Sequence, residues 1–381
     1  MKEVTSLDKF AKGTGIVCEY NPFHKGHAYQ IEYVKNMGAE FVVCAMSGDF
    51  TQRAQSAFQD KRVRAENAVR NGADIVLEVP FPFSSMSAEG FARAGISVLE
   101  NSGLCSSFAF GSECADVEKL EKTARVLDMA FHKEVVALQK DEPNLAYASA
   151  RERLICQKLG SDYSLLVRNP NDILAIEYLK SNKSLCPIAI ERKTPRGGYD
   201  ENFASSSYIR KALFCEDEKE RALWGLPEDY SFEGIYEDDS GFYNHVLLSL
   251  MQKTQEELSE CAEVQKGCEY SIIKNAQKAE CFDELCRLLA SKTLTDAKIR
   301  RMLLFSFFGV PGSALKQKPL YTQVLCASEK GRKMLKKYAG DRKIIVASRI
   351  SDIKKDDKAF RQYEFSRKAG EVLDKCRKIM R

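Results

Sequence analysis

The chain has 381 residues, of which 44% are hydrophobic and 29% are charged, and its formal net charge is +4. This length suits two domains, and this share of apolar residues suffices for a substantial core. No apolar run reaches the roughly 18–20 residues that span a bilayer, and the N-terminus lacks the apolar stretch of a secretory signal. The sequence therefore predicts a cytoplasmic protein without a membrane partner.

Thirteen cysteines are scattered along the chain, which is a high and odd number. No two of them have C-x-x-C spacing, so neither a zinc site nor a thioredoxin-type redox site is indicated. We expect reduced thiols that pack as small apolar side chains. The prediction is that protein side chains bind no metal ion.

Up to about residue 115, short apolar runs alternate with amphipathic segments. The apolar runs predict buried strands at 15–18, 41–46, 74–80 and 108–110. The segments between them predict helices at 28–37, 58–71 and 87–101. This alternation indicates a parallel sheet covered by helices on both faces. Ligands of such sheets bind beyond the carboxyl ends of the strands, where residues 21–27, 47–53 and 111–113 fall.

The rest of the chain is predicted to be mainly helical. Residues 115–160 carry helical periodicity without a chemical motif. A helix ending near residue 180, a strand at 187–192 and a Ser-capped helix starting near 204–210 then continue the alternation. An acidic stretch at 216–239 separates this part from later segments with helical periodicity, at 242–258, 285–289, 297–308 and 359–380.

Charge is distributed unevenly along the chain. Residues 214–263 carry 14 acidic and 3 basic side chains, whereas residues 287–381 carry 25 Lys and Arg against 9 Asp and Glu. A basic segment attached to a balanced protein favours a polyanionic partner such as a nucleic acid. A lysine-rich solvated surface is the alternative interpretation.

Two of the four histidines lie in the H-x-G-H sequence His24–His27. A predicted strand precedes them and a predicted helix follows, so both imidazoles and a helix N-terminus face one place. Imidazoles can donate hydrogen bonds to phosphate oxygens, and Gly26 lets the backbone approach a nucleotide closely. Helix capping or packing would explain a bare H-x-G-H, but this setting favours nucleotide binding.

The stretch Glu19–His27 resembles the first motif of the H-x-G-H nucleotidyltransferase superfamily, and more narrowly that of the bacterial tRNA(Met) cytidine acetate ligase family. Further segments resemble the same family in the same order: 46–53, 72–80, 110–113, 169–178, 207–213 and 299–303. The resemblance implies an α/β fold, with a Rossmann-like parallel-sheet nucleotidyltransferase domain and a C-terminal mainly α-helical domain. Lys25 and Asp172 depart from the family pattern, in which asparagine is common at both positions.

On this basis we expect three parts. Residues 1–215 would form the ATP-binding catalytic domain, with a helical insertion at about 115–165. Residues 216–240 would be an acidic linker, and residues 241–381 a basic helical tRNA-binding domain.

The resemblance also implies an activity. The family's enzymes are ATP-dependent ligases that activate acetate as acetyl-adenylate and acetylate the exocyclic amine of the wobble cytidine of elongator tRNA(Met). AMP and pyrophosphate are released. We expect Mg²⁺ to be bound through the ATP phosphates, and no protein partner is implied.

Residue roles follow from the same resemblance. His24 and His27 are the expected catalytic residues. The expected ATP-binding residues are Val17, Cys18, Glu19, Tyr20, Asn21, Pro22, Phe23, His24, Lys25, Gly26, His27, Ala28, Tyr29, Gln30, Gly111, Asn171 and Arg192. Ser206, Ser207 and Arg210 resemble a segment by which related transferases hold pyrophosphate, and Arg300 and Arg301 are the expected tRNA contacts.

Alternatives remain open at this point. Taken alone, Asn171 equally suits a helix cap, Arg192 and Arg210 suit surface ion pairs, and Cys18 suits packing rather than nucleophilic attack. A small-molecule adenylyltransferase would leave AMP on its product, and a binding module would lack catalysis. The basic C-terminal half disfavours the first of these functions, and the intact histidine pair disfavours the second.

Overall fold

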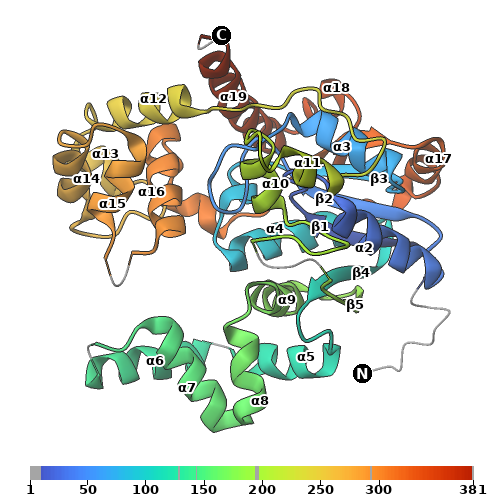
Figure 1. Cartoon of the computed structure of the whole chain (residues 1–381), viewed down its shortest axis with the longest axis horizontal. Coiled ribbons are helices and arrows are strands. Elements are labelled where there is room, and N and C mark those ends of the chain that lie inside the picture. The colour runs from blue at the N-terminus through green and yellow to red at the C-terminus, as the bar shows by residue number, and fades with distance from the viewer. Residues whose placement is uncertain (1–9, 128, 143, 194–196, 292–293, 380–381) are drawn as a thin grey trace.

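The computed structural model describes residues 10–127, 129–142, 144–193, 197–291 and 294–379. Its centre is a seven-stranded sheet with the strand order β5-β4-β1-β2-β3-β6-β7 (Figure 1). The strands are β1 (Gly13–Cys18), β2 (Val42–Ser47), β3 (Ile75–Val79), β4 (Cys105–Ser112), β5 (Cys186–Glu191), β6 (Tyr321–Ala327) and β7 (Ile345–Ala347). All neighbouring strands are parallel except β3 and β6, which pair antiparallel.

The sheet is buried on both faces because alternate side chains of its strands point to opposite sides. In β2, Val43 and Ala45 belong to one hydrophobic cluster, which also contains apolar residues of α4 (Ala88–Asn101). Val42, Cys44 and Met46 belong to a second cluster. This second cluster includes residues of α2 (Lys25–Asn36), α3 (Lys61–Arg70) and α10 (Ser206–Ala212). The continuous apolar run of β2 is thus that of a central parallel strand.

The strands and helices predicted up to residue 115 are confirmed, with shifts of a few residues at their ends. The order of the strands places the carboxyl ends of β1, β2, β4 and β5 at one edge of the sheet. The order in which successive strands are added to the sheet reverses at β1. The strands β2 and β3 follow on one side of it, and β4 and β5 follow on the other. Parallel sheets hold ligands at such a position.

The C-terminal half differs from the prediction of one helical unit over residues 241–381. Its segments β6 and β7 complete the sheet on the β3 side. Between them, α17 (Glu329–Lys337) packs so closely on the start of β3 that a Cβ atom at Gly331 would lie 2.0 Å from the Asp74 carbonyl oxygen. The strands escaped prediction because their polar and apolar residues do not alternate cleanly, and α17 interrupts them.

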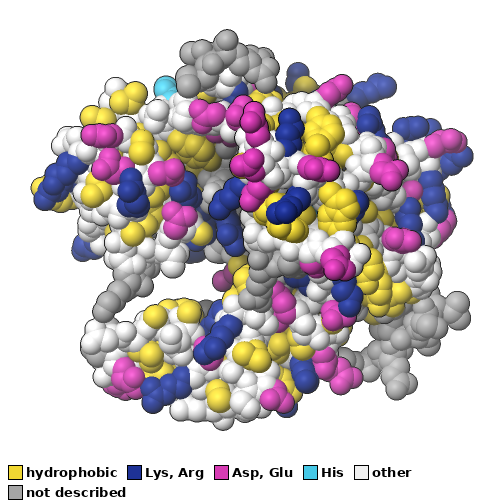
Figure 2. Space-filling model, in the orientation of Figure 1, with side chains coloured by type: hydrophobic (Ala, Val, Ile, Leu, Met, Phe, Trp, Pro, Cys, Tyr) yellow, Lys and Arg dark blue, Asp and Glu magenta, His cyan; other side chains and the backbone are white. Residues whose placement is uncertain are grey.

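Two groups of helices extend from the sheet (Figure 1). The first is the predicted insertion, with α5 (Val117–Val126), α6 (Met129–Asp141), α7 (Tyr147–Leu159) and α8 (Ser161–Ser164), and it returns to the sheet through α9 (Pro170–Ser181). The second is a bundle of α12 (Ser240–Leu250), α13 (Gln255–Ser259), α14 (Cys268–Ala276), α15 (Phe282–Leu289) and α16 (Asp296–Phe308). Figure 2 shows a hollow between the two groups, with Lys and Arg side chains beside it.

The remaining helical elements connect these parts. They are α11 (Lys219–Trp224), α18 (Ile350–Ile353) and α19 (Asp357–Ile379), together with the 3-10 turns Phe83–Ser85, Leu165–Val167, Gly312–Lys316 and Ala339–Asp341. The helical stretch predicted at 242–258 is two helices, α12 and α13, and Thr254 caps the second one.

All thirteen cysteines are free thiols, as predicted. Within the described parts of the chain, no helix has the length and apolar character that crossing a membrane requires.

Candidate active site

A cavity of about 640 Å³ opens at the carboxyl ends of β1, β4 and β5. Its walls come from the loop after β1 with the first turns of α2, from the loop after β2, from the ends of β4 and β5, and from the starts of α9 and α10. Sites at this edge of a parallel sheet collect backbone N–H groups and helix N-termini, both of which favour an anion. Most of the predicted ATP-binding residues meet here.

The two histidines are held by the helix that they begin. The Gly26 backbone N–H donates to Nδ1 of His24 over 3.0 Å, and the His24 N–H donates to Nδ1 of His27 over 3.3 Å. The two rings are stacked with centroids 3.7 Å apart. Because each Nδ1 is an acceptor, the neutral ring carries its proton on Nε2. Capping therefore leaves each imidazole one remaining donor, the Nε2–H group.

Both imidazoles are neutral at physiological pH. Burial, reinforced by the positive charge of Arg192, lowers the pKa of His24 to about 3. Burial, the neighbouring His24 and Arg192 lower the pKa of His27 well below its usual value. The pair is consequently suited to donating hydrogen bonds to an oxyanion, and not to general-base catalysis near pH 7.

Residues between β1 and α2 lock this turn in place. The ring of Tyr20 is buried against His27, with centroids 4.7 Å apart, and its hydroxyl contacts Cys44 Sγ at 3.3 Å. The side-chain oxygen of Asn21 accepts a hydrogen bond of 2.7 Å from the Phe58 N–H. The loop after β2 is thereby tied to the histidine turn.

The loop after β2 is also supported from below. Glu19 accepts a 2.6 Å hydrogen bond from the Gln52 N–H, and the buried Arg64 donates to the carbonyl oxygens of Glu19 and Gly48. Gln52 and its neighbours Thr51, Arg53 and Gln55 line the cavity. A single buried arginine therefore joins the ends of β1 and β2 at the site.

Cationic groups stand at the cavity wall. Arg192 follows β5 directly and is near enough to the histidines to lower their pKa values. Arg210, from α10, donates to the carbonyl oxygen of Asn21, and Ser206 donates to that of Pro22 over 3.4 Å. Ser206, Ser207, Arg192 and Arg210 all line the cavity, together with Lys193 and Arg53. This concentration of positive charge suits a polyphosphate.

The far wall is formed where β4 meets α9. Gly111 is the penultimate residue of β4, and a Cβ atom placed on it would meet no atom within 4 Å, so its missing side chain leaves room in the cavity. Asn171 lines the same wall and donates to Glu113 over 3.0 Å. Asp172 is buried, and its Oδ1 accepts from the Ser112 hydroxyl and from the N–H groups of Glu113 and Cys114. The aspartate at this departure from the family pattern thus fixes the loop after β4.

The structure separates a few predicted site residues from the cavity. Pro22, Phe23, Lys25 and Ala28 are not among its lining residues, and the Lys25 ammonium instead lies 4.6 Å from the centre of the Trp224 ring. Ten other positions between Val17 and Gln30 do line it. Phe23 is fully buried and belongs to the core beneath the turn.

The two arginines predicted to contact tRNA are both paired with carboxylates. Arg301 is 8% exposed and pairs with Glu263 at 3.2 Å. Arg300 pairs with Asp283 at 2.7 Å and with Asp296 at 3.0 Å. The prediction of a tRNA contact does not fit the placement of Arg301, because its guanidinium is buried in the helical bundle and paired with Glu263. Sequence periodicity could not show this, because the partner carboxylates lie on other segments: Glu263 in the turn between α13 and α14, and Asp283 on α15.

Several lining residues were not predicted individually. Phe91, Phe110, Leu174, Tyr178 and Ile190 supply apolar walls, and Ser205 caps α10 by accepting from the Tyr208 N–H. Their apolar character made them indistinguishable from core residues in the sequence. Gln52 and Arg53 lie in the segment 47–53, which the sequence placed at the carboxyl edge of the sheet. That placement was the sequence signal that could have identified them as site residues. Among the described residues no group of three or more His, Cys, Asp or Glu side chains is arranged to hold a metal ion.

A parallel α/β sheet with an H-x-G-H turn at its ligand-binding edge defines a nucleotidyltransferase-type fold and site. The model of the HIGH Nucleotidyl Transferase family matches residues 11–379 of the chain. The tRNA(Met) cytidine acetate ligase of Thermoanaerobacter pseudethanolicus is 31% identical over 366 residues, which cover 89% of each protein. That of Lysinibacillus sphaericus is 32% identical over 369 residues, covering 89% of this chain and 90% of the relative.

Solved structures agree with these sequence matches. Thermotoga maritima TmcAL bound with alpha-thio ATP superposes with a TM-score of 0.84 and 26% identity, covering 96% of this chain and 94% of the other. The apo form of the same protein gives a TM-score of 0.85 at 27% identity, covering 94% and 93%. The chain belongs to the HIGH nucleotidyltransferase family and, within it, to the family of tRNA(Met) cytidine acetate ligases. The predicted family and fold class are therefore confirmed.

Proposed function

We propose that the chain is an ATP-dependent ligase that forms N4-acetylcytidine at the wobble position of elongator tRNA(Met), using acetate and releasing AMP and pyrophosphate. The observation that carries this proposal is the neutral, stacked pair His24 and His27 with both Nε2–H donors remaining, next to Arg192 in a 640 Å³ cavity. The relatives' names supply the tRNA and the cytidine, and the solved relative was crystallised with an ATP analogue.

In the first step a carboxylate oxygen of acetate attacks the α-phosphorus of ATP. The bond from that phosphorus to the bridging oxygen of the β-phosphate breaks, and pyrophosphate leaves. Negative charge gathers on the α-phosphate oxygens, where the two Nε2–H groups would donate without any change of protonation. Ser206 at the start of α10 and Arg210 in its last turn would hold the departing pyrophosphate.

In the second step the cytidine N4 attacks the acetyl carbon. The bond from that carbon to the AMP oxygen breaks, AMP leaves, and N4 loses one proton. The protein's part is to position the two reactants and to exclude water from the adenylate. Mg²⁺ would be held through the ATP phosphates, because the described residues contain no group of side chains arranged for a metal.

Exposed cations of the C-terminal half would attract the tRNA backbone. Such contacts predict an affinity for tRNA that falls steeply with salt. In this proposal, exposed cations replace Arg300 and Arg301 as the groups that contact the tRNA.

The test is incubation of the full chain with ATP, radiolabelled acetate and total tRNA, followed by nucleoside analysis. We expect label in N4-acetylcytidine, with AMP formed in equal amount and acetate-dependent exchange of pyrophosphate into ATP in the absence of tRNA. Incorporation of AMP into a small-molecule product, without acetate-dependent exchange, would overturn the proposal in favour of a small-molecule adenylyltransferase.

A further inference from the structure

A second cavity of about 420 Å³ adjoins the first one and shares Asn21, Gln55 and Arg210 with it. Its walls come from segments that are far apart in the sequence: the loop after β2, the end of α10, the segment leading into α12, and the starts of α15 and α16. The shared wall carries the arginine and asparagine next to the histidine turn. A molecule in the second cavity would therefore face a nucleotide bound in the first.

Five aromatic side chains line this second cavity. They are Phe58, Phe214, Tyr236, Tyr243 and Phe282. Phe214 is 43% exposed, and its ring centre lies 5.8 Å from that of the buried Phe58. An exposed phenyl ring at a cavity wall is a surface that a planar ligand can cover. Nucleobases of single-stranded RNA are held by stacking on such rings.

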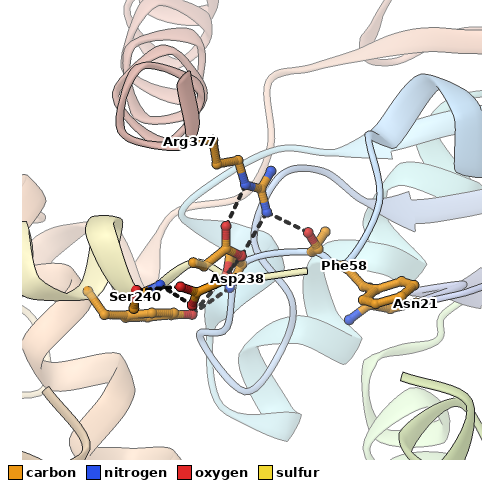
Figure 3. A network of polar contacts seen from close by, with 9 residues as sticks. Asn21, Phe58, Asp238, Ser240 and Arg377 are labelled. Carbon is orange, nitrogen blue, oxygen red and sulfur yellow. Dashed lines mark hydrogen bonds and ion pairs between the residues drawn. The ribbon is translucent and has the colours of Figure 1, made fainter. Parts of the chain in front are cut away.

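Carboxylates give the second cavity its charge. Asp239 is fixed by Arg377, with contacts of 2.6 and 2.9 Å, and Figure 3 shows Arg377 pointing into this group of polar contacts. Asp283 is fixed by Arg300. Asp238 accepts from the backbone and the hydroxyl of Ser240. Within the described parts of the chain, Glu237 is the lining carboxylate with no hydrogen-bond or ion-pair partner. Its acceptor capacity is available to a ligand that carries an N–H donor.

The charge of this cavity disfavours a phosphate and favours a base. Four carboxylates face two arginines in its walls, whereas the first cavity has more arginine and lysine than glutamate. The phosphates of ATP and of an RNA backbone would be repelled. A base whose exocyclic amine donates to a carboxylate would be accepted, which is the pairing by which Glu and Asp recognise cytosine N4.

We propose that the second cavity is the pocket for the acceptor nucleobase: a cytosine turned out of single-stranded RNA stacks on Phe214, and its exocyclic amine donates to Glu237. This inference rests on the proposed function, and it adds where the acceptor base lies and which side chains select it. The RNA backbone stays outside the pocket, and the amine reaches the adenylate past the wall shared through Arg210 and Asn21.

The experiment compares Phe214→Ala and Glu237→Gln with wild type in two assays on the full chain. Acetate-dependent pyrophosphate exchange without tRNA measures the first cavity, and single-turnover acetyl transfer to tRNA(Met) measures both. We expect exchange within twofold of wild type and transfer reduced about tenfold or more in each variant. Phe232→Ala and Glu233→Gln are the matched controls, since both residues are exposed and line neither cavity.

A specificity readout separates recognition from mere structure. A tRNA(Met) in which the wobble cytidine is replaced by uridine serves as a competitor, because uracil presents an acceptor where cytosine presents the amine. Wild type should prefer the cytidine form, and Glu237→Gln should lose most of that preference.

The outcomes distinguish the two proposals. Unchanged transfer and unchanged preference in both variants, with an active wild type, would overturn the base pocket alone. A parallel fall of exchange and transfer would also overturn it, because the residues would then serve the ATP site. A wild-type enzyme without acetate-dependent exchange would overturn the proposed function itself.

Discussion

The two adjoining cavities differ in charge, although they share three residues. The first contains arginines, a lysine and two imidazoles that burial keeps neutral. The second contains four carboxylates, of which Asp239 and Asp283 are each neutralised by an arginine. Two adjoining cavities of opposite charge would allow one protein to distinguish a polyphosphate from an amine-bearing base. A polyphosphate would be repelled by the carboxylates of the second cavity, and the amine of a base would find no carboxylate partner among the cations of the first.

They also differ in how they are held. The first is built on strand ends and helix starts, so backbone capping sets its geometry. The second depends on side chains that bridge separate segments. Arg377 of α19 illustrates this: it pairs with Asp239, donates to the Ala57 carbonyl oxygen over 2.7 Å and stacks 3.5 Å from the Tyr236 ring centre.

The largest expected effect is on stability, from removing that bridge. In Arg377→Met the carboxylate of Asp239 would remain in a largely buried place without its partner, and we expect a loss of about 3–5 kcal/mol in the free energy of unfolding. Urea denaturation measures it. Lys375→Met on the exposed side of α19 is the control, and adding Asp239→Asn should recover part of the loss. Equal midpoints for Arg377→Met and the control would show that the second cavity does not need this bridge.

The next effect concerns the first cavity alone. His27→Ala removes one of the two Nε2–H donors that we propose for the α-phosphate oxygens, and we expect acetate-dependent pyrophosphate exchange to fall about 10²–10³-fold. Binding of tRNA should remain, because replacing this neutral imidazole removes no positive charge. His132→Ala changes a histidine of α6 that lines neither cavity and should exchange like wild type. Normal exchange in His27→Ala would remove the basis for assigning ATP to this cavity.

A pH dependence of stability should separate the buried histidines from exposed ones. Below pH 6.5 the unfolded chain protonates both histidines while the folded protein, with His24 at a pKa of about 3, does not. The unfolded state then binds more protons, so the free energy of unfolding falls as pH decreases from 7.5 to 5.5. For His24 the loss of stability over this interval is about 1 kcal/mol. His27 contributes in the same direction. The stability that the neutral rings contribute is present above the unfolded pKa of about 6.5 and is lost progressively as the pH falls through it.

Urea unfolding of the ATP-free protein at pH 7.5 and 5.5 checks this dependence. The double variant His24→Gln/His27→Gln should lose stability less steeply than wild type over that interval, while His132→Gln should follow wild type. Identical slopes for the double variant and wild type would mean that these rings titrate normally, and that the first cavity is wetter than its geometry indicates.

The smallest effect is expected at Lys25, a member of the H-x-G-H motif that lies outside the cavity. Its contact with Trp224 is worth about 0.5–1 kcal/mol, so Lys25→Ala should lower pyrophosphate exchange by no more than a few-fold. Fluorescence of Trp224, the only tryptophan, reports the lost contact. A loss of pyrophosphate exchange as large as that of His27→Ala would mean that Lys25 contacts the phosphates and belongs to the lining of the first cavity.

Local sequence placed the first cavity at the correct edge of the sheet, and the family resemblance supplied Gly111 and Arg192. A buried strand must end, the next residues must cap the following helix, and parallel strands bring such ends to one edge. The positions of His24, His27, Gly111 and Arg192 at a common site follow from that rule and from the family resemblance. The same reasoning predicted the strands of the first half, since each is a compact apolar run.

Only the tertiary structure decided the C-terminal half. That β6 pairs antiparallel with β3 depends on contacts across more than 200 residues, which no local periodicity records. Whether an arginine is a surface cation or a buried partner depends equally on the carboxylate that another segment brings to it, as the turn between α13 and α14 brings Glu263 to Arg301. The sequence by itself determined the strand-end chemistry and the overall charge; folding determined which charges are neutralised and which, like Glu237, remain available, because ion pairing requires proximity in space.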